Sequence, residues 1–184
     1  MEKEISRRSF LRLGSTAAMG LAVSPSLLMG QSKKKKNAAP LPMDRKLKIL
    51  AVGIGGRGAS VLRGLEKEDI IGLCDVDWKY AMPIFERYPD AKRYNDYKVM
   101  FAELLDEADA VVVATADHTH AIIAAEAIAA GKHVYVEKPL THTVYESRLL
   151  TRLAKKYGVA TQMGNPGSSG DGVKTVCEGI WNGE

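Results

Sequence analysis

The chain has little cysteine and few aromatic residues. Two of its 184 residues are cysteines, Cys74 and Cys177, and 7% are aromatic. Two cysteines so far apart form neither a C-x-x-C pair nor a disulfide framework, which excludes zinc ribbons and disulfide-stapled scaffolds. Cys74 ends an apolar run, which favours a small, buried hydrophobic side chain. We expect no metal site.

The body of the chain also lacks a basic surface. The formal net charge is +4, but eight basic against two acidic residues in the first 36 positions give +6, which leaves −2 for residues 37–184. A nucleic-acid-binding domain would carry clustered Lys and Arg. We therefore expect no nucleic-acid partner, and the Lys33–Lys36 run fits a solvated linker better than a polyanion site.

A long, uniformly hydrophobic run is missing as well. The most apolar stretch, over 13–30, contains Gly, Ser, Thr and Pro, which makes it a poor membrane helix. The run Ser6-Arg7-Arg8-Ser9-Phe10-Leu11-Arg12 precedes it and resembles a twin-arginine export signal. We expect residues 1–36 to be a twin-arginine signal peptide with a basic linker, and the body to be periplasmic without a stable membrane anchor. A retained N-terminal anchor is the alternative.

What the chain does have is an alternation of short apolar runs with helical patterns. Continuous apolar strands separated by helices predict a parallel sheet covered on both faces. The expected fold class is α/β, a Rossmann-type doubly wound parallel sheet over residues 46–165, with its ligand crevice at the carboxyl ends of the strands. We expect strands over 48–52, 70–74, 110–114, 133–136 and 159–163, and helices over 59–65, 78–88, 98–105, 121–130 and 144–157.

A glycine-rich motif follows the first expected strand. Its sequence is Gly53-Ile54-Gly55-Gly56-Arg57-Gly58, which matches G-x-G-x-x-G. Gly53 permits the tight turn, Gly55 lets the backbone approach a pyrophosphate, and Gly58 allows close packing of helix on strand. The N–H groups of the next helix offer an anion site. The strand before and the helix after the motif favour dinucleotide binding.

An acid ends the second expected strand. Asp75 lies 22 residues after Gly53, where a carboxylate would accept hydrogen bonds from the adenine ribose hydroxyls. The 2′-phosphate of NADP would meet a like charge there, so NAD is the expected cofactor and NADP is disfavoured. The competing interpretation is that Asp75 only caps the helix that begins near Trp78, a task that Asp77 could also perform.

Three later motifs fall in order along the chain. Thr115-Ala116-Asp117-His118-Thr119-His120, Gly131-Lys132-His133-Val134 and Glu137-Lys138-Pro139 together resemble the Gfo/Idh/MocA oxidoreductase family. The resemblance covers about residues 46–165. It implies an NAD(P)-dependent enzyme that acts on sugars or polyols and forms a homo-oligomer.

The resemblance also implies roles for single residues. Lys138 matches the family's catalytic lysine, whose ammonium can hydrogen-bond the substrate oxygen and join proton transfer. Glu137 matches the acid beside the nicotinamide ribose, and the bond before Pro139 is often cis. Lys138 is also expected to contact the cofactor. Three more positions line the nicotinamide half of the site: Thr115, Asp117 and His120. Structural roles compete for His118, His120 and His142, and His133 is expected to be structural.

The sequence departs from the family pattern at three places. Ala116 stands where the family usually has Pro, and Asp117 where Asn is common. The last expected strand leads into Gly164-Asn165-Pro166 rather than the usual Arg-Phe. With the twin-arginine signal and Thr141-His142-Thr143, this variant resembles an exported, Bacteroidetes-type branch.

The family's second domain, an α/β substrate domain, is expected to be absent. Residues 166–184 would be the start of the connection to it, and the chain alone would bind NAD weakly and turn over nothing. The leading hypothesis is an NAD-dependent oxidoreductase that transfers hydride from a sugar. A glycoside-cleaving enzyme that recycles bound NAD and a non-catalytic nucleotide-binding module are the alternatives.

Overall fold

The structure, a computed structural model, describes residues 45–183. The predicted twin-arginine signal and its linker therefore lie outside the described residues. Within 45–183 no helix has the length and hydropathy required to cross a bilayer.

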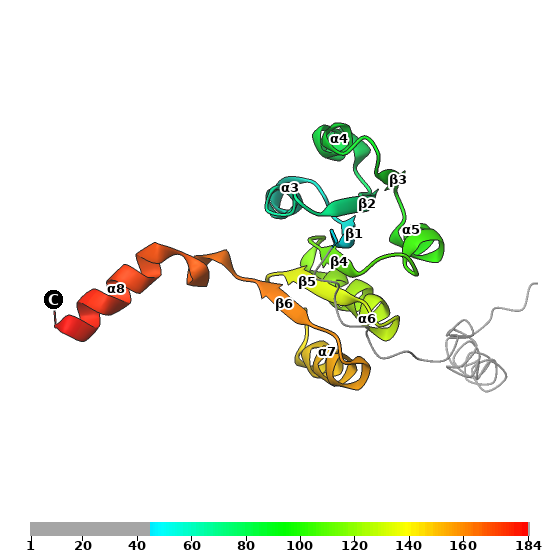
Figure 1. Cartoon of the computed structure of the whole chain (residues 1–184). Coiled ribbons are helices and arrows are strands. Elements are labelled where there is room, and N and C mark those ends of the chain that lie inside the picture. Colours follow the sequence, from blue (N-terminus) through cyan, green and yellow to red (C-terminus); the bar gives the residue numbers. More distant parts are fainter. Residues whose placement is uncertain (1–44, 184) are drawn as a thin grey trace, which may run out of the picture. The chain divides into compact units, whose positions relative to one another are not determined.

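A parallel sheet of six strands forms the centre of the described part (Figure 1), and its strand order is β3-β2-β1-β4-β5-β6. Every neighbouring pair is parallel, for example β1 with β2 and β1 with β4. This is the order of the Rossmann fold, and it confirms the predicted fold class. The strands are β1 (Lys48–Val52), β2 (Asp69–Cys74), β3 (Lys92–Tyr94), β4 (Ala110–Val113), β5 (His133–Glu137) and β6 (Thr161–Gly164).

Helices connect the strands on both faces of the sheet (Figure 1). Each crossover carries one α-helix, as parallel pairing requires. The α-helices are α3 (Gly56–Arg63), α4 (Trp78–Arg87), α5 (Tyr97–Leu104), α6 (His120–Ala129), α7 (Val144–Tyr157) and α8 (Asp171–Asn182), and two 3-10 turns are η1 (Asp117–Thr119) and η2 (Pro166–Ser169).

Two hydrophobic cores result from the alternation of side chains along the central strands. On β1, Ile49 and Ala51 join the core under α3 and α4, whereas Leu50 and Val52 join the core under α5, α6 and α7. Both faces of the strand are therefore buried, which explains why its sequence is apolar throughout. Burial of each such aliphatic side chain contributes roughly 1.5–3 kcal/mol.

Local sequence signals set both ends of α7. Thr143 Oγ1 accepts a hydrogen bond from the Glu146 amide, and the Glu146 carboxylate accepts one from the Thr143 amide, which is a capping box. Gly158 ends the helix in the left-handed conformation, at φ +66°. The Glu146 carboxylate also accepts from the amide of His142, so this segment initiates the helix.

The observed elements differ from the predicted ones at two places that matter for the site. Helix α3 begins at Gly56 rather than at 59, so Arg57 and Gly58 lie in its first turn. Strand β3 was not predicted, because Lys92 and Arg93 are exposed and only Tyr94 is buried. Its Tyr94 carbonyl nevertheless accepts from the amide of Asp75 and fixes the end of β2.

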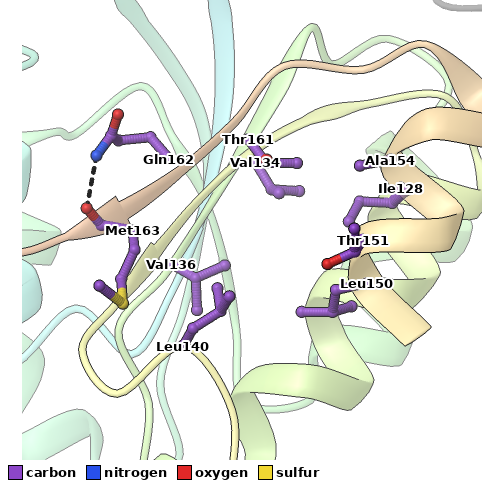
Figure 2. A pocket seen from close by; sticks show the side chains of 10 residues that line it. All are labelled: Ile128, Val134, Val136, Leu140, Leu150, Thr151, Ala154, Thr161, Gln162 and Met163. Carbon is purple, nitrogen blue, oxygen red and sulfur yellow. Dashed lines mark hydrogen bonds between the residues drawn. The ribbon is translucent and has the colours of Figure 1, made fainter. Parts of the chain in front are cut away.

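A small hollow lies between α7 and the β5–β6 side of the sheet (Figure 2). Its volume is about 80 Å³, and it has predominantly apolar walls that include Ile128, Val134, Val136, Leu150 and Met163. Its polar lining residues are Thr151, Thr161 and Gln162. A space of this size and lining is a packing gap rather than a ligand site.

Helix α8 stands apart from both cores in its burial. None of its residues is buried, although Val173, Val176, Ile180 and Trp181 recur at helical spacing. Such a stripe is typical of a helix that packs against another element. In the described residues α8 contributes nothing to the core of the sheet.

Candidate functional site

The glycine loop follows β1 at the carboxyl edge of the sheet, as predicted. Gly53 has φ +77°, and its amide donates to the Cys74 carbonyl at 2.9 Å. A Cβ at this position would lie 2.6 Å from the carbonyl carbon of Ala114, at the end of β4. Only glycine tolerates both the backbone conformation and the contact, so the loop is locked between the ends of β2 and β4.

Helix α3 presents an uncapped N-terminus from this loop. Its N-cap is Gly55, which has no side chain to bond the first N–H groups, and its first turn contains no acid. Gly58 is buried, and a Cβ there would overlap the carbonyl oxygen of Gly53. The free N–H groups and the helix dipole therefore form an anion site at the position predicted for a pyrophosphate.

Asp75 ties the loop to the end of β2. Its Oδ2 accepts from the amides of Ile54 (2.8 Å) and Gly55 (3.1 Å), and its Oδ1 accepts from the amide of Asp77 (3.0 Å). A carboxylate offers about four lone-pair sites, so capacity remains for a ribose hydroxyl. The helix cap belongs to Asp77, whose carboxylate accepts from the Tyr80 amide.

A cavity of about 740 Å³ lies over the ends of β1, β2 and β4. Gly53, Gly55, Asp75 and Thr115 line it, so four predicted cofactor residues are brought together there. Its volume falls in the range of small-molecule sites. The fit of a dinucleotide rests on this cavity, on the uncapped helix and on four loop glycines at which a Cβ would clash, Gly53, Gly55, Gly56 and Gly58.

Sequence reasoning missed two aromatic walls of this cavity. Tyr80 is exposed and lies over the loop, since a Cβ on Gly55 or Gly56 would run into its ring or hydroxyl. Tyr97 opens α5, after β3, and also lines the cavity. The usable signal was their position in the first turn of a helix that follows a strand, because those turns face the crevice.

The segment after β4 places the predicted Asp117 in the turn η1, where it is exposed. Thr119 Oγ1 bonds to Oγ1 of Thr115 at 2.7 Å and to the Ala116 carbonyl at 2.8 Å, which fixes the turn. His118 is exposed and lines the cavity, whereas Asp117 does not. The nicotinamide contacts assigned to Thr115 and Asp117 stay predictions.

His120 lies inside the protein, with 1% of its surface exposed. Its Nδ1 is 2.6 Å from the Pro139 carbonyl oxygen and its Nε2 is 3.1 Å from the Thr115 carbonyl oxygen. Carbonyl oxygens only accept, and a neutral imidazole carries one N–H, so the tautomer sets which of the two carbonyls receives the hydrogen bond. In either tautomer the ring lies between the turn after β4 and the turn after β5. The geometry thus gives His120 a structural role between the two turns. Its direct contact with the cofactor stays a prediction.

Glu137 ends β5 and Lys138 follows it, at the same edge of the sheet. Glu137 is buried, whereas Lys138 is exposed, and neither lines the 740 Å³ cavity. The Lys138–Pro139 peptide bond is cis, as the family resemblance implied. The exposed Lys138 amine is available to a molecule bound beyond the end of β5, and its catalytic role stays a prediction.

Arg57 connects the glycine loop to Glu137. Its Nε donates to Oε1 of Glu137 at 3.0 Å across 80 residues of sequence. Burial works to raise the pKa of Glu137, but hydrogen bonds from Arg57, the Lys138 amide and Tyr135 outweigh it and lower that pKa below its ordinary value of 4.5. The hydrogen bond to Glu137 raises the pKa of Arg57 in turn.

The described residues offer no metal-binding cluster, and the buried thiol of Cys74 is not reactive. Among residues 45–183 no group of three or more His, Cys, Asp and Glu side chains could hold a metal ion. Cys74 is buried, and burial followed by the charge of Asp75 raises its pKa to about 12, so its thiol is protonated.

Comparison with known proteins gives the site its context. Residues 47–165 match the Gfo/Idh/MocA family, described as an oxidoreductase family with an NAD-binding Rossmann fold. The inositol 2-dehydrogenase of Salmonella typhimurium is 30% identical over 117 residues, which cover 61% of this chain and 34% of that protein. The alpha-N-acetylgalactosaminidase of Shewanella oneidensis is 27% identical over 164 residues, which cover 77% and 35%.

A solved structure agrees with these relatives. The WlbA dehydrogenase of Chromobacterium violaceum, in complex with NADH and UDP-GlcNAcA, is 25% identical with a TM-score of 0.60, over 70% of this chain and 38% of that one. The chain thus spans about a third of the length of the curated relatives that it matches.

Proposed function

Because the chain belongs to the Gfo/Idh/MocA oxidoreductase family, with its NAD-binding Rossmann fold, we propose that it is the nucleotide-binding part of an NAD-dependent oxidoreductase. The proposed reaction is hydride transfer from a sugar or sugar derivative. The observation that carries the proposal is one edge of the sheet. An anion-binding helix N-terminus follows β1 there, a ribose-binding acid follows β2, and the Glu137-Lys138 pair lies at the end of β5. Relatives named for inositol and for a nucleotide sugar support the substrate class.

The residues of the chain would divide the dinucleotide among them. The first turn of α3 holds the pyrophosphate, Asp75 accepts from the adenine ribose, and the cavity beside Tyr80 and Tyr97 encloses the adenosine half. The charge of Asp75 opposes a 2′-phosphate, which favours NAD over NADP. Glu137 accepts from the nicotinamide-side ribose.

Lys138 supplies the polar chemistry toward the substrate. When bound, the nicotinamide ring provides a hydride acceptor. The Lys138 ammonium would hydrogen-bond the hydroxyl oxygen of the substrate, and its Nζ in the neutral form would take the hydroxyl proton as a carbonyl forms. A lysine can alternate between these states more readily than an arginine could.

Titration calorimetry tests the proposal directly. The full chain is titrated with NAD and with NADP, and then with NAD after Lys138→Met. We expect a clear preference for NAD and a Lys138→Met affinity within about threefold of wild type, because the lysine faces the substrate rather than the nucleotide. Absence of binding to either nucleotide would overturn the proposal.

Turnover separates the proposed reaction from binding alone. Because the chain alone is expected to turn over nothing, NADH fluorescence is followed in a protein that joins this chain to a substrate domain, and in the same protein with Lys138→Met. Myo-inositol and nucleotide sugars are the candidate substrates. Stoichiometric NADH that disappears in Lys138→Met supports the oxidoreductase. Binding that no substrate converts to turnover, and that is indifferent to Lys138, would support a non-catalytic nucleotide-binding module instead.

A second candidate function is redox-neutral glycoside cleavage. It is favoured by the similarity to the Shewanella oneidensis alpha-N-acetylgalactosaminidase, which extends over more of this chain than the similarity to the inositol dehydrogenase. Such a reaction would oxidise one sugar hydroxyl to a ketone, with the hydride passing to bound NAD, and would eliminate the glycosidic group together with a neighbouring C–H proton. Water would then add to the resulting double bond, and the hydride would return to the ketone. Release of 4-nitrophenol from a nitrophenyl glycoside without net NADH would identify it.

Export is part of the proposal as well. The Ser6–Arg12 sequence supports a twin-arginine signal and a periplasmic location of an exported, Bacteroidetes-type family member. This route carries folded proteins, so a nucleotide could be loaded before export. Replacement of Arg7 and Arg8 by Lys should retain the chain in the cytoplasm on cell fractionation, and continued export would contradict the assignment. A homo-oligomer is also proposed, to be checked by analytical ultracentrifugation.

A further inference from the structure

The ion pair between Arg57 and Glu137 joins an exposed group to a buried one. The Arg57 side chain is 48% exposed, whereas that of Glu137 is 4% exposed. A buried carboxylate is costly unless it is paired and hydrogen-bonded. The ion pair therefore stabilises the charged form of the buried Glu137 more than that of the exposed Arg57.

Three donors fix the Glu137 carboxylate. Oε1 accepts from Nε of Arg57 (3.0 Å) and from the Tyr135 hydroxyl (3.1 Å), and Oε2 accepts from the Lys138 amide (3.2 Å). Both donors to Oε1 are side chains, from α3 and from β5. Oε2 has only a backbone donor, so it is the oxygen with capacity for a ribose hydroxyl.

The neighbouring strand β6 leaves room for this arrangement. A Cβ on Gly164 would overlap the Tyr135 hydroxyl and lie 2.6 Å from Oε1 of Glu137. A side chain at position 164 would therefore displace the phenol or the carboxylate where they meet the end of β6. The charged or titratable groups that face Glu137 are Arg57 from α3, Tyr135 on β5 and the adjoining Lys138, and β6 adds none.

We infer that Arg57, assisted by Tyr135, is a positioning residue that holds the Glu137 carboxylate as an acceptor for the nicotinamide-side ribose. The inference rests on the proposed function. It gives Arg57 a task beyond the pyrophosphate next to it, because its Nε is committed to Glu137. The glycine loop and the β5 turn are thereby coupled.

The coupling predicts a pH effect on nucleotide binding. With Arg57 in place the pKa of Glu137 is lowered, so the carboxylate stays ionised at pH 5–8. Without Arg57, burial is less opposed and the pKa of Glu137 rises. The ribose acceptor is then present at high pH and is lost as the pH falls toward 5.

The test compares two nucleotides on the full chain. ADP reaches the pyrophosphate site but has no second ribose, whereas NAD reaches both. Dissociation constants are measured by calorimetry at pH 5 to 8 for wild type, Arg57→Met and Tyr135→Phe. Ratios of variant to wild type at each pH cancel the titration of ADP itself.

We expect the NAD affinity of Arg57→Met, relative to wild type, to fall by a further factor of about ten between pH 8 and pH 5. The ADP ratio should stay constant with pH. Tyr135→Phe should change the NAD ratio in the same direction by a smaller factor, and Arg57→Lys should restore most of the wild-type behaviour. In Arg57→Met/Glu137→Gln the pH dependence should disappear.

Three results would overturn the inference. Equal, pH-independent weakening of NAD and ADP would show that Arg57 acts on the pyrophosphate alone. Persistence of the pH effect in the double variant would assign it to another group. A wild-type chain that binds neither nucleotide would remove the proposed function, and the inference with it. Circular dichroism checks that each variant is folded. If Arg57→Met does not fold, the pH dependence of NAD binding by Tyr135→Phe decides the inference instead.

Discussion

The carboxyl edge of the sheet has two parts, the ends of β1, β2 and β4 and the end of β5, and they are built differently. At the ends of β1, β2 and β4 the chain encloses a cavity of about 740 Å³ and holds its wall by backbone hydrogen bonds to Asp75. At the end of β5 the charged Lys138 is exposed and lines neither the 740 Å³ cavity nor the 80 Å³ hollow. One half is complete within residues 45–183, and the other presents its chemistry to an external surface.

The difference separates binding from reaction. Positions that would hold the adenosine and pyrophosphate are preorganised, because the strands that carry them are central and buried on both faces. Positions that would face a substrate depend on what lies against the β5 and β6 ends. Changes at the enclosed half should therefore alter nucleotide affinity, and changes elsewhere should leave it alone.

The largest effect is expected for Gly53→Ala. The added Cβ meets the Ala114 backbone and the residue must keep φ +77°, so the loop shifts away from β4. We expect an NAD affinity lower by about 100-fold and a free energy of unfolding lower by about 1–3 kcal/mol. Calorimetry and urea unfolding measure the two.

Gly158→Ala is the matched control for that change. Gly158 also has positive φ, +66°, but nothing lies within 4 Å of its Cβ position. It should lose about 1 kcal/mol of stability and keep the wild-type NAD affinity. If both variants lost NAD affinity equally, the loop would have no special status and the comparison would fail.

Asp75→Ala should have the next largest effect. It removes the ribose acceptor together with the bonds to the Ile54 and Gly55 amides. We expect about a tenfold loss of NAD affinity and loss of the preference over NADP. Asp77→Ala, which only uncaps α4, should cost about 1 kcal/mol of stability and leave the NAD to NADP ratio unchanged. A ratio altered by Asp77→Ala would speak against the assignment.

The opposite edge of the sheet should govern acid stability instead. The hydrogen bond from Arg45 is the largest cause that lowers the pKa of Asp109 below 3.8, and the Lys48 amide also donates to this carboxylate. Because the folded-state pKa is depressed, this stabilisation is present above pH 4 and is lost as the pH falls.

Asp109→Asn tests this edge. At pH 7 it should lose about 1 kcal/mol of unfolding free energy, and the difference from wild type should vanish near pH 2. NAD affinity should not change. Glu107→Gln, whose partner Lys48 is 3.7 Å away at the exposed surface, should have almost no effect on stability. A pH-independent loss in Asp109→Asn would contradict the electrostatic explanation.

The smallest effect is expected at the hollow beneath α7 (Figure 2). Thr151→Leu would fill part of its 80 Å³ and replace a β-branched residue in the helix. We expect a gain of about 0.5–1 kcal/mol in unfolding free energy, measured by thermal melting, with no change in NAD affinity. Weaker NAD binding would show that packing on the β5–β6 side of the sheet affects the 740 Å³ cavity.

Much of this architecture could be predicted from the sequence. The strand over 48–52 and the helix over 144–157 coincide with the observed elements, because one is apolar throughout and the other is bounded by Thr143 and Gly158. The glycine loop and Asp75 were found because their spacing follows from the βαβ geometry. The fold class followed from the alternation alone.

What could not be predicted depends on contacts distant in sequence. The start of α3 was placed too late because glycine is a poor helix former, whereas the packing of Gly58 on Gly53 draws the loop into the helix. Nothing local to Arg57 indicates Glu137, and nothing local to His120 indicates its burial under the Pro139 carbonyl. Tertiary geometry alone supplies these pairs.

The strand order has a consequence for how the chain acquires its structure. The first strand in sequence, β1, is an inner strand of the sheet, and its partner β4 lies about 60 residues later. On the ribosome, β1 must therefore wait until Val113 has emerged before its second partner is present. Such distant parallel pairing slows folding. The glycine loop also packs against Ala114, which follows β4. The nucleotide site therefore forms only after β4 has joined the sheet, and nucleotide binding stabilises the chain late in folding rather than guiding its first steps.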